Sequence, residues 1–372
     1  MDSSRPGRAR IPASRVDAFL RALGAGFEVF APQEDATSGM VHFARLREGS
    51  PVVVGGPNTA VPPKSLFFPQ SETLFSFVKG RDSLEITDSI SRPGGGRRLV
   101  FGVRPCDLVA LARLDLVFAK DIADPYYTSK RESTIIIGLG CEEPSRTCFC
   151  TSFGYGPGDG QGADVFLLPS SGGQGGEVLY TVQVFTESGL KFAEEHSSFF
   201  EGRGQVALEQ ELSEDPEVKA LRKELAKRVK TRVDPAGVEL EMRQLWDAPY
   251  WGTLSRRCLA CGICTYNCPT CHCFDIHDTN RLSMGERFRC WDTCMSRAFT
   301  LAAGGHNPRP TKRERVRQRF MHKLRYFKDR YGEQLCIGCG RCVEQCPTNI
   351  DIRKIIDDVH DLVSGKEAAA GA

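Results

Sequence analysis

Long apolar runs, strong net charge and nucleotide-binding loops are all missing from this sequence of 372 residues. No apolar run approaches the ~20 residues that a helix needs to cross a bilayer, so we expect no direct insertion into a membrane. The polar start of the chain lacks the apolar stretch of a secretory signal. A formal net charge of +2 argues against nucleic-acid or membrane binding through overall charge.

Nucleotide-binding signatures are absent as well. The sequence has no G-x-x-x-x-G-K-[ST] phosphate loop, and no G-x-G-x-x-G follows a predicted strand. The Gly-rich segment at residues 154–176 is instead typical of a loop, with a short strand at residues 165–168. These absences leave the chain without a recognisable dinucleotide site of its own.

Cysteine, by contrast, is abundant, with 16 residues. Eight of them form two runs with the spacing C-x2-C-x2-C-x3-C-P. Used twice, this spacing holds two [4Fe–4S] clusters, and the fourth cysteine of each run ligates the cluster of the other run. The first cluster is therefore assigned to Cys258, Cys261, Cys264 and Cys346. The second cluster is assigned to Cys336, Cys339, Cys342 and Cys268.

Structural zinc is the alternative for these runs. Four-cysteine zinc sites usually combine two C-x2-C pairs across a longer loop, which is not the pattern here. Crossed ligation would make the two clusters neighbours that can pass electrons. Thiolate ligands also require a reducing compartment, so we expect a cytoplasmic protein rather than a disulfide-bonded one.

Two buried-type strands are predicted in the N-terminal half, at residues 99–103 and 134–139. Between them, residues 104–106 indicate a turn, and residues 108–118 a helix with Asp107 as its N-cap. A strand–helix–strand unit implies parallel strands whose carboxyl ends share one edge of the sheet, where such sheets place their sites.

Four further cysteines follow these two strands. Cys106 comes just after the first strand and Cys141 directly after the second, so the two can meet at that edge. Cys148 and Cys150 lie in the loop that follows. Together the four predict a third [4Fe–4S] cluster; a zinc site and unrelated buried thiols are the alternatives.

These patterns predict a mixed α/β N-terminal domain followed by a mainly α-helical, ferredoxin-like dicluster domain. The expected divisions are a flexible N-terminus at 1–15, the α/β domain at 16–233, the dicluster domain at 234–360 and a flexible tail at 361–372. Cys268 and Cys336 are separated by 67 residues rich in helix formers. We therefore expect helices there rather than a compact β-type ferredoxin.

Residues 281–330 carry 14 Lys or Arg against 4 Asp or Glu. This basic segment could compensate the charge of anionic clusters, dock an acidic partner or present a solvated helix face; no nucleic-acid-binding motif accompanies it. The four cysteines that belong to none of these predicted sites are Cys271, Cys273, Cys290 and Cys294. They could form another metal site with His272 or His277, or lie as buried thiols beside the clusters.

Several motifs together resemble the β iron–sulfur subunit of soluble hydrogenases and sulfhydrogenases. They are GVRPCDL (102–108), C-x2-P-x3-C-F-C-x-S-x-G (141–154), CPTCHCF (268–274), WDTC (291–294), GGHNPRP (304–310), HKLRY (322–326) and CIGCGRC (336–342). The resemblance covers about residues 70–355. The corresponding iron–sulfur subunit of anaerobic sulfite reductase is similar, as are the electron-transfer subunits of heterodisulfide-reductase-like complexes.

The resemblance implies a subunit that relays electrons between a flavin subunit linked to NAD(P)H and a catalytic hydrogenase or reductase subunit. The chain also lacks the paired Cys-Cys-Gly motifs of a heterodisulfide-cleaving centre. Two other hypotheses remain. One is a stand-alone reductase with a substrate-binding cluster at the N-terminal cysteines and Asp107 as acid–base group. The other is a zinc-dependent nucleic-acid module that uses the basic segment.

Overall fold

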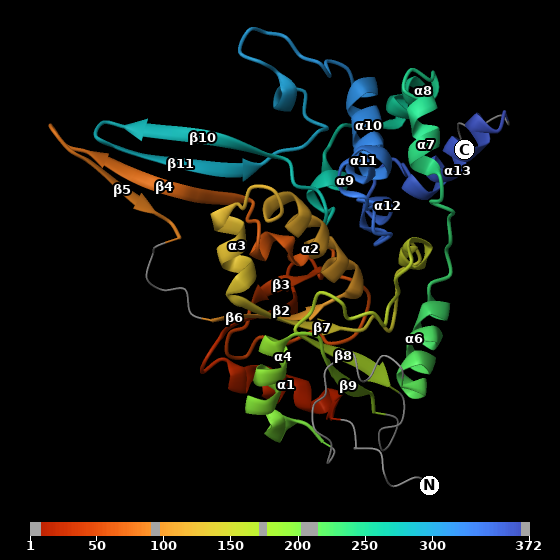
Figure 1. Ribbon diagram of the computed structural model, residues 1–372. Helices are drawn as coiled ribbons and strands as arrows, with labels where there is room; N and C mark the ends of the chain where they lie inside the picture. The colour runs from red at the N-terminus through yellow and green to blue at the C-terminus, as the bar shows by residue number, and fades with distance from the viewer. Residues whose placement is uncertain (1–8, 91–96, 171–176, 202–214, 366–372) are drawn as a thin grey trace. The chain divides into compact units, whose positions relative to one another are not determined.

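The structure is a computed structural model, which describes residues 9–90, 97–170, 177–201 and 215–365 (Figure 1). Parts of the expected flexible ends and of the Gly-rich loop therefore lie outside the described residues. The chain forms two compact units. Unit 1 comprises residues 1–63, 94–112 and 130–230, and unit 2 comprises residues 64–93, 113–129 and 231–372.

Unit 1 is built on a seven-stranded mixed sheet in the order β1-β9-β8-β7-β6-β2-β3. Its strands are β1 (Arg10–Pro12), β2 (Glu28–Glu34), β3 (Val41–Arg45), β6 (Arg98–Val103), β7 (Thr134–Leu139), β8 (Val165–Ser170) and β9 (Leu179–Val184). The central neighbours β2, β6, β7 and β8 are parallel, whereas β1, β9 and β3 join antiparallel. The prediction of two parallel strands around a helix is thus confirmed.

Helices cover both faces of this sheet. On one face, α1 (Ala13–Leu23) and α4 (Glu187–Glu195) pack through Phe19, Leu20 and Phe192 against inward-facing strand residues. On the other face, Leu108 of α2 (Pro105–Phe118) lies against Gly138 of β7, where a Cβ would sit 3.1 Å from the leucine. Unit 1 also contains α6 (Pro216–Arg228) and the 3-10 turns η2 (Cys150–Phe153) and η4 (Ser197–Phe199).

Helix α2 begins earlier than the sequence predicts. It starts at Pro105, so residues 104–106 are not a separate turn and Asp107 lies in the first helical turn rather than at the N-cap. The backbone carbonyl of Arg104 accepts from Asp107 and Leu108. Proline favours the first helical position because its missing N–H would have no partner there.

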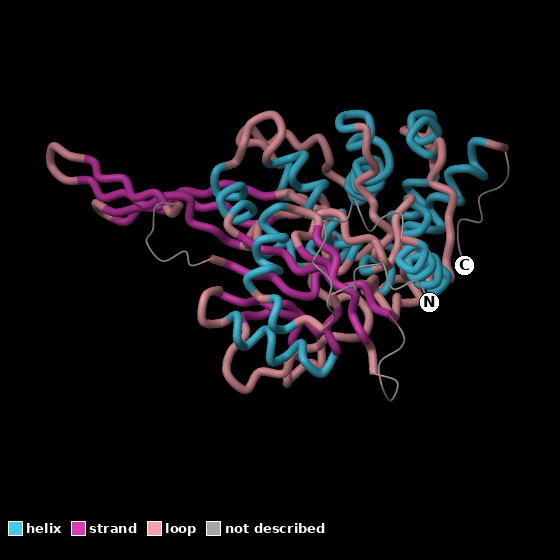
Figure 2. Tube along the Cα trace, turned by 60° about the horizontal axis from the view of Figure 1, so that its bottom comes forward, coloured by secondary structure: helices cyan, strands magenta, loops and turns pink. Residues whose placement is uncertain are grey.

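Unit 2 contains a four-stranded antiparallel sheet in the order β10-β11-β4-β5. Its strands are β4 (Ser71–Lys79), β5 (Leu84–Asp88), β10 (Phe274–Arg281) and β11 (Met284–Trp291), which run side by side in both views (Figure 1 and Figure 2). The expectation that helices fill the segment between the cysteine runs is therefore not met at residues 274–291. Strand β11 pairs with β4, about 200 residues away, and a contact so distant leaves no local signal.

The remaining elements of unit 2 are mostly helical, although the domain expected to be mainly helical, at 234–360, also contains the β10–β11 hairpin. They are η1 (Pro63–Leu66), α7 (Val238–Gln244), α8 (Tyr250–Arg257), α9 (Ile263–Tyr266), η5 (Ala298–Thr300), α10 (Lys312–Met321), the π-helix η6 (His322–Tyr326), α11 (Phe327–Tyr331), α12 (Arg341–Glu344) and α13 (Ile352–Val363). Helix α3 (Pro125–Glu132) connects the two units along the chain. Within the described ranges, no helix has the length and apolarity needed to span a bilayer.

The sequence predicts one boundary between two continuous domains, at residue 233, whereas each compact unit combines separate stretches of the chain. Residues 64–93 and 113–129 belong to unit 2, although they precede most of unit 1 in the chain. Arg289 of β11 explains part of this arrangement, because its buried guanidinium pairs with Glu72 of β4 and with Asp124. Strand β11, which belongs to the cysteine-rich half of the chain, thus forms ion pairs with both of these earlier segments.

Candidate iron–sulfur centres

The two cysteine runs follow the same backbone path. Ala260 and Gly262 of the first run have φ values of 58° and 79°. Gly338 and Gly340 occupy the equivalent places in the second run, with φ values of 65° and 76°. Each run then enters a short helix, α9 or α12. Left-handed residues curl the chain tightly, which is how three closely spaced cysteines come to face one centre.

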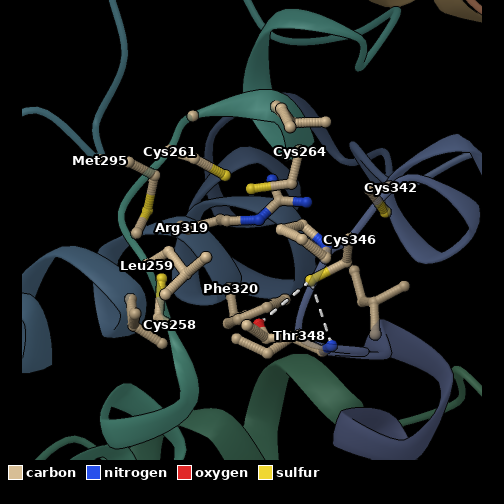
Figure 3. Close-up of a pocket in the computed structure, with 16 residues that line it drawn as sticks. Cys258, Leu259, Cys261, Cys264, Met295, Arg319, Phe320, Cys342, Cys346 and Thr348 are labelled. Carbon is tan, nitrogen blue, oxygen red and sulfur yellow. Dashed lines mark hydrogen bonds between the residues drawn. The ribbon is translucent and has the colours of Figure 1, made fainter.

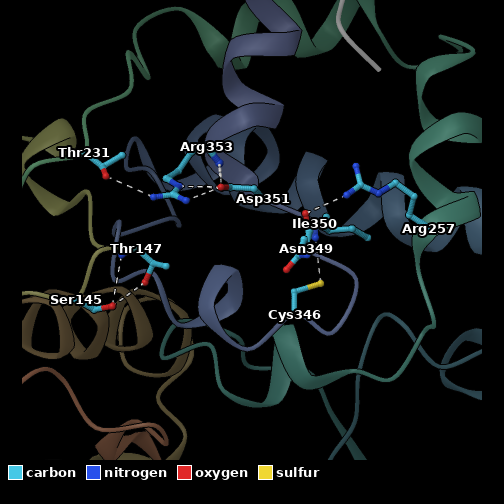
Figure 4. Close-up of polar contacts among 9 residues, drawn as sticks. All are labelled: Ser145, Thr147, Thr231, Arg257, Cys346, Asn349, Ile350, Asp351 and Arg353. Atoms are coloured by element: carbon cyan, nitrogen blue, oxygen red, sulfur yellow. Dashed lines mark hydrogen bonds and ion pairs between the residues drawn. The ribbon is translucent and has the colours of Figure 1, made fainter. Parts of the chain in front are cut away.

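Contacts between the runs hold them together. Helices α9 and α12 touch each other, and the Asn267 amide donates to Gln345, the residue at the equivalent position of the other run. Arg257, which precedes Cys258, donates to the carbonyl oxygen of Thr348 at 3.3 Å. It also donates to the carbonyl oxygen of Asn349 at 3.4 Å (Figure 4). The end of the second run is therefore fixed beside the start of the first.

The four cysteines predicted for the first cluster line a single pocket (Figure 3). They are Cys258, Cys261, Cys264 and Cys346. Cys342 of the second quartet lines the same pocket, and so does Arg319. Most of the remaining wall is apolar, with Met295, Val316 and Phe320 among its residues. The structure thus brings Cys346 across from the other run, as crossed ligation requires.

The environment of these sulfurs suits a cluster. The backbone N–H of Ala260 donates to the Cys258 sulfur at 3.3 Å, and that of Ile350 donates to the Cys346 sulfur at 3.2 Å (Figure 4). Burial raises the pKa of Cys264, against the effect of the nearby Arg319. A thiol that burial keeps protonated becomes a thiolate when iron replaces its proton, and N–H groups then stabilise the sulfur.

The second predicted quartet also comes together. Burial raises the pKa of Cys336 to about 12, and Lys323, Cys339 and Cys268 are among its electrostatic neighbours. The backbone N–H of Gly338 donates to the Cys336 sulfur and works in the opposite direction. Burial likewise raises the pKa of the fourth member, Cys342, which has Arg319, Cys339 and Cys268 beside it. Cys336 and Cys342 are therefore neighbours of each other, and both have Cys339 and Cys268 beside them.

Cys271 supports the second quartet without belonging to it. Its thiol donates to the Cys268 sulfur, and this bond, helped by Lys323 and Arg319, lowers the pKa of Cys268. The same contact raises the pKa of Cys271. Cys268 is thus prepared as the thiolate form that binds iron.

Two buried cations of the basic segment lie at the cysteines. Arg319 of α10 and Lys323 of η6 are 5% and 3% exposed. Although burial alone would lower the pKa of Lys323, Cys268 and Cys271 raise it, and its Nζ donates to Thr270 at 2.6 Å. These placements support charge compensation of the clusters as one role of the basic segment.

The other leftover cysteines do not gather into one group. Cys273 lies beside Cys294, whose backbone N–H donates to the Cys273 sulfur, while Cys290 lies on β11 near Asp275 and Asp292. Across the described part of the chain, no three His, Cys, Asp or Glu side chains converge where one metal ion would sit. His272 is half-buried, and burial lowers its pKa to about 4. His277 instead lies 3.7 Å from Asp275 on the exposed β10.

In unit 1, the four N-terminal cysteines are all buried, between 7% and 9% exposed. Cys106 lies in the first turn of α2, after β6, and Cys141 follows the neighbouring parallel strand β7. Cys141 lies near Arg104 and Asp107, and its pKa is raised by burial in spite of Arg104. Arg104 donates to the carbonyls of Gly140, Gly55 and Gly56 and so fixes residues 55–56 beside the end of β7.

Sequence analysis alone could not have selected Arg319, Lys323 or Cys271 for these roles. The basic segment was visible, but 14 cations in 50 residues give no reason to prefer two of them. Cys271 was visible as a cysteine outside the spacing rule. Its role depends on the fold of residues 268–271, which places the Cys271 thiol next to the Cys268 sulfur.

The comparisons with known proteins agree with this geometry. Residues 257–350 match a family described as a 4Fe-4S dicluster domain. The chain is also similar to the protein named sulfhydrogenase 2 subunit beta of Pyrococcus furiosus. The two are 33% identical over 304 residues, which cover 82% of this chain and 84% of that relative.

Proposed function

Because this chain belongs to the family of the sulfhydrogenase β subunits, we propose that it is the iron–sulfur electron-transfer subunit of a cytoplasmic oxidoreductase complex. In that complex it relays electrons between a flavin subunit linked to NAD(P)H and a catalytic subunit of the hydrogenase, sulfite reductase or heterodisulfide-reductase-like kind. The observation that carries the proposal is the pocket in which Cys346 joins Cys258, Cys261 and Cys264. A relay needs clusters, insulation and docking faces rather than a catalytic constellation.

The ligands follow the assignment made from the spacing. Cys258, Cys261, Cys264 and Cys346 hold one cluster, and Cys336, Cys339, Cys342 and Cys268 hold the other. Each cluster, when bound, supplies reversible storage of one electron. The chain's own residues keep the two electron stores adjacent, because Cys342 of the second quartet also borders the first pocket. Met295, Val316 and Phe320 give that pocket an apolar wall.

The complex itself can be tested by purification under anaerobic conditions from the native source. We expect an affinity-tagged chain to bring down a flavoprotein and a catalytic subunit, and reduction of the flavoprotein by NAD(P)H to reduce the clusters of this chain. A stable, lone monomer would contradict the proposal. Turnover of sulfite, a disulfide or a quinone by the isolated chain would favour the stand-alone reductase instead.

A third cluster at Cys106, Cys141, Cys148 and Cys150 is part of the proposal. The burial of all four and the placement of Cys106 and Cys141 at neighbouring strand ends support it. With three clusters we expect about twelve irons per chain, little zinc, and a loss of about four irons in a Cys106→Ser, Cys141→Ser double variant.

The matched control for this iron count is Cys290→Ser. Cys290 lies on a hairpin strand near Asp275 and Asp292, outside every proposed ligand set, so its replacement should leave the iron content unchanged. About eight irons in the unmodified chain, with none lost in the double variant, would remove the third cluster and leave the other two. Zinc in place of iron would remove all three.

A further inference from the structure

One buried guanidinium lies between the two cysteine quartets. Arg319 projects from α10 into the pocket of the first quartet, where Figure 3 shows it beside Cys264. The same side chain has Cys342 and Cys268 of the second quartet among its electrostatic neighbours. Arg319 therefore has thiols of both predicted clusters beside it.

Arg319 has a hydrogen-bond donor that no protein atom satisfies within the described residues. Its Nη1 is buried, and within the described residues this nitrogen has no hydrogen-bond partner. A guanidinium that is 5% exposed loses its hydration, and an unmade bond of a buried charged donor is costly. Thiolates and sulfides of an anionic cluster are acceptors that would compensate such a group.

We propose that Arg319 is a positioning residue shared by both clusters, which raises the reduction potentials of the two together. The inference rests on the proposed two-cluster function. When a cluster accepts one electron its negative charge increases by one, and a fixed cation beside it stabilises this reduced form. Because Arg319 is only 5% exposed, water screens that interaction only weakly. Because both potentials move in the same direction, the energy step for an electron that passes between the clusters changes little.

Lys323 is a second buried cation with which the effect of Arg319 on the clusters can be compared. It is equally buried, but the quartet thiols beside it, Cys268 and Cys336, are both assigned to the second cluster, and its Nζ is already bonded to Thr270. It should therefore act on one cluster only. Arg315, one turn before Arg319 on α10, donates instead to the carbonyls of Arg309 and Pro310 and serves as the control.

The test compares Arg319→Gln, Arg319→Lys, Lys323→Gln and Arg315→Gln in the full-length, anaerobically purified chain. Reductive titrations followed by electron paramagnetic resonance measure the midpoint potential of each cluster, and Cys268→Ser and Cys346→Ser backgrounds assign the signals. We expect Arg319→Gln to move both potentials to more negative values, and Arg319→Lys to move both by less. Lys323→Gln should shift only the cluster of Cys336, and Arg315→Gln neither.

A shift of one potential alone in Arg319→Gln, or of neither, overturns the shared role. If Arg319→Gln binds less iron, a shared position requires both clusters to be depleted, and depletion of one only contradicts it. Failure of the underlying function looks different, because the unmodified chain would then lack two reducible clusters before any substitution at Arg319 is made.

Discussion

Replacing Cys268 with serine is expected to remove the cluster held by Cys336, Cys339 and Cys342, although Cys268 belongs to the other run. About four irons per chain should be lost, because a [4Fe–4S] cube that lacks one of its four thiolates is poorly retained. The pocket that Cys346 shares with the first run supports this crossing, and so does the position of Cys268 beside Cys336 and Cys342.

The measurement is iron and sulfide analysis together with electron paramagnetic resonance of the dithionite-reduced protein. Cys268→Ser should retain the signal of the cluster at Cys258, and the reciprocal variant Cys346→Ser should retain the other signal. If Cys268→Ser instead loses the cluster of its own run, each run ligates its own cube and the electron-relay proposal loses its main support. Cys290→Ser again provides a cysteine variant that should change nothing.

A second large effect is expected on stability, from Arg289→Met. Arg289 is 2% exposed, donates to Glu72 at 2.8 Å and pairs with Asp124. Its guanidinium also lies over the Phe68 ring, 5.0 Å from the centroid. Methionine preserves the apolar packing but leaves two carboxylates without their cation. Breaking a buried ion pair in this way typically costs about 3–5 kcal/mol.

The cost can be measured by urea unfolding followed through tryptophan fluorescence. All three tryptophans belong to unit 2, so the signal reports the unit that contains Arg289. Arg287→Met is the matched control, because Arg287 lies on the same strand but forms an exposed pair with Asp278. Equal losses of stability in the two variants would contradict the prediction, because the buried ion pairs of Arg289 would then stabilise the protein no more than the exposed pair of Arg287.

Local patterns were sufficient where the interacting residues are near in sequence or follow a spacing rule. The strands at 99–103 and 134–139, their parallel arrangement and the positions of Cys106 and Cys141 just past the ends of these strands could all be predicted. Two buried runs of branched residues joined by a crossover helix permit few alternative strand arrangements. The start of α2 was missed because a proline can end a turn or open a helix equally well.

The hairpin at residues 274–291 was missed for a different reason. Its strand β11 is paired on one side by β10 and on the other by β4, which lies in the N-terminal half of the chain. Strand propensity depends on such neighbours, and they are invisible when one segment is considered at a time. The division of the chain into units has the same cause.

The amino-acid sequence by itself determined the dicluster motif and the mixed α/β character of the N-terminal half, and it predicted the crossed assignment of the eight cysteines. These depend on spacing and periodicity, which are properties of short segments. Only the tertiary structure decided which of the many cations lie at the thiols, which spare cysteine supports Cys268 and which early strands join the second unit. Those choices depend on burial and on contacts between distant segments, and chain folding alone brings such segments together.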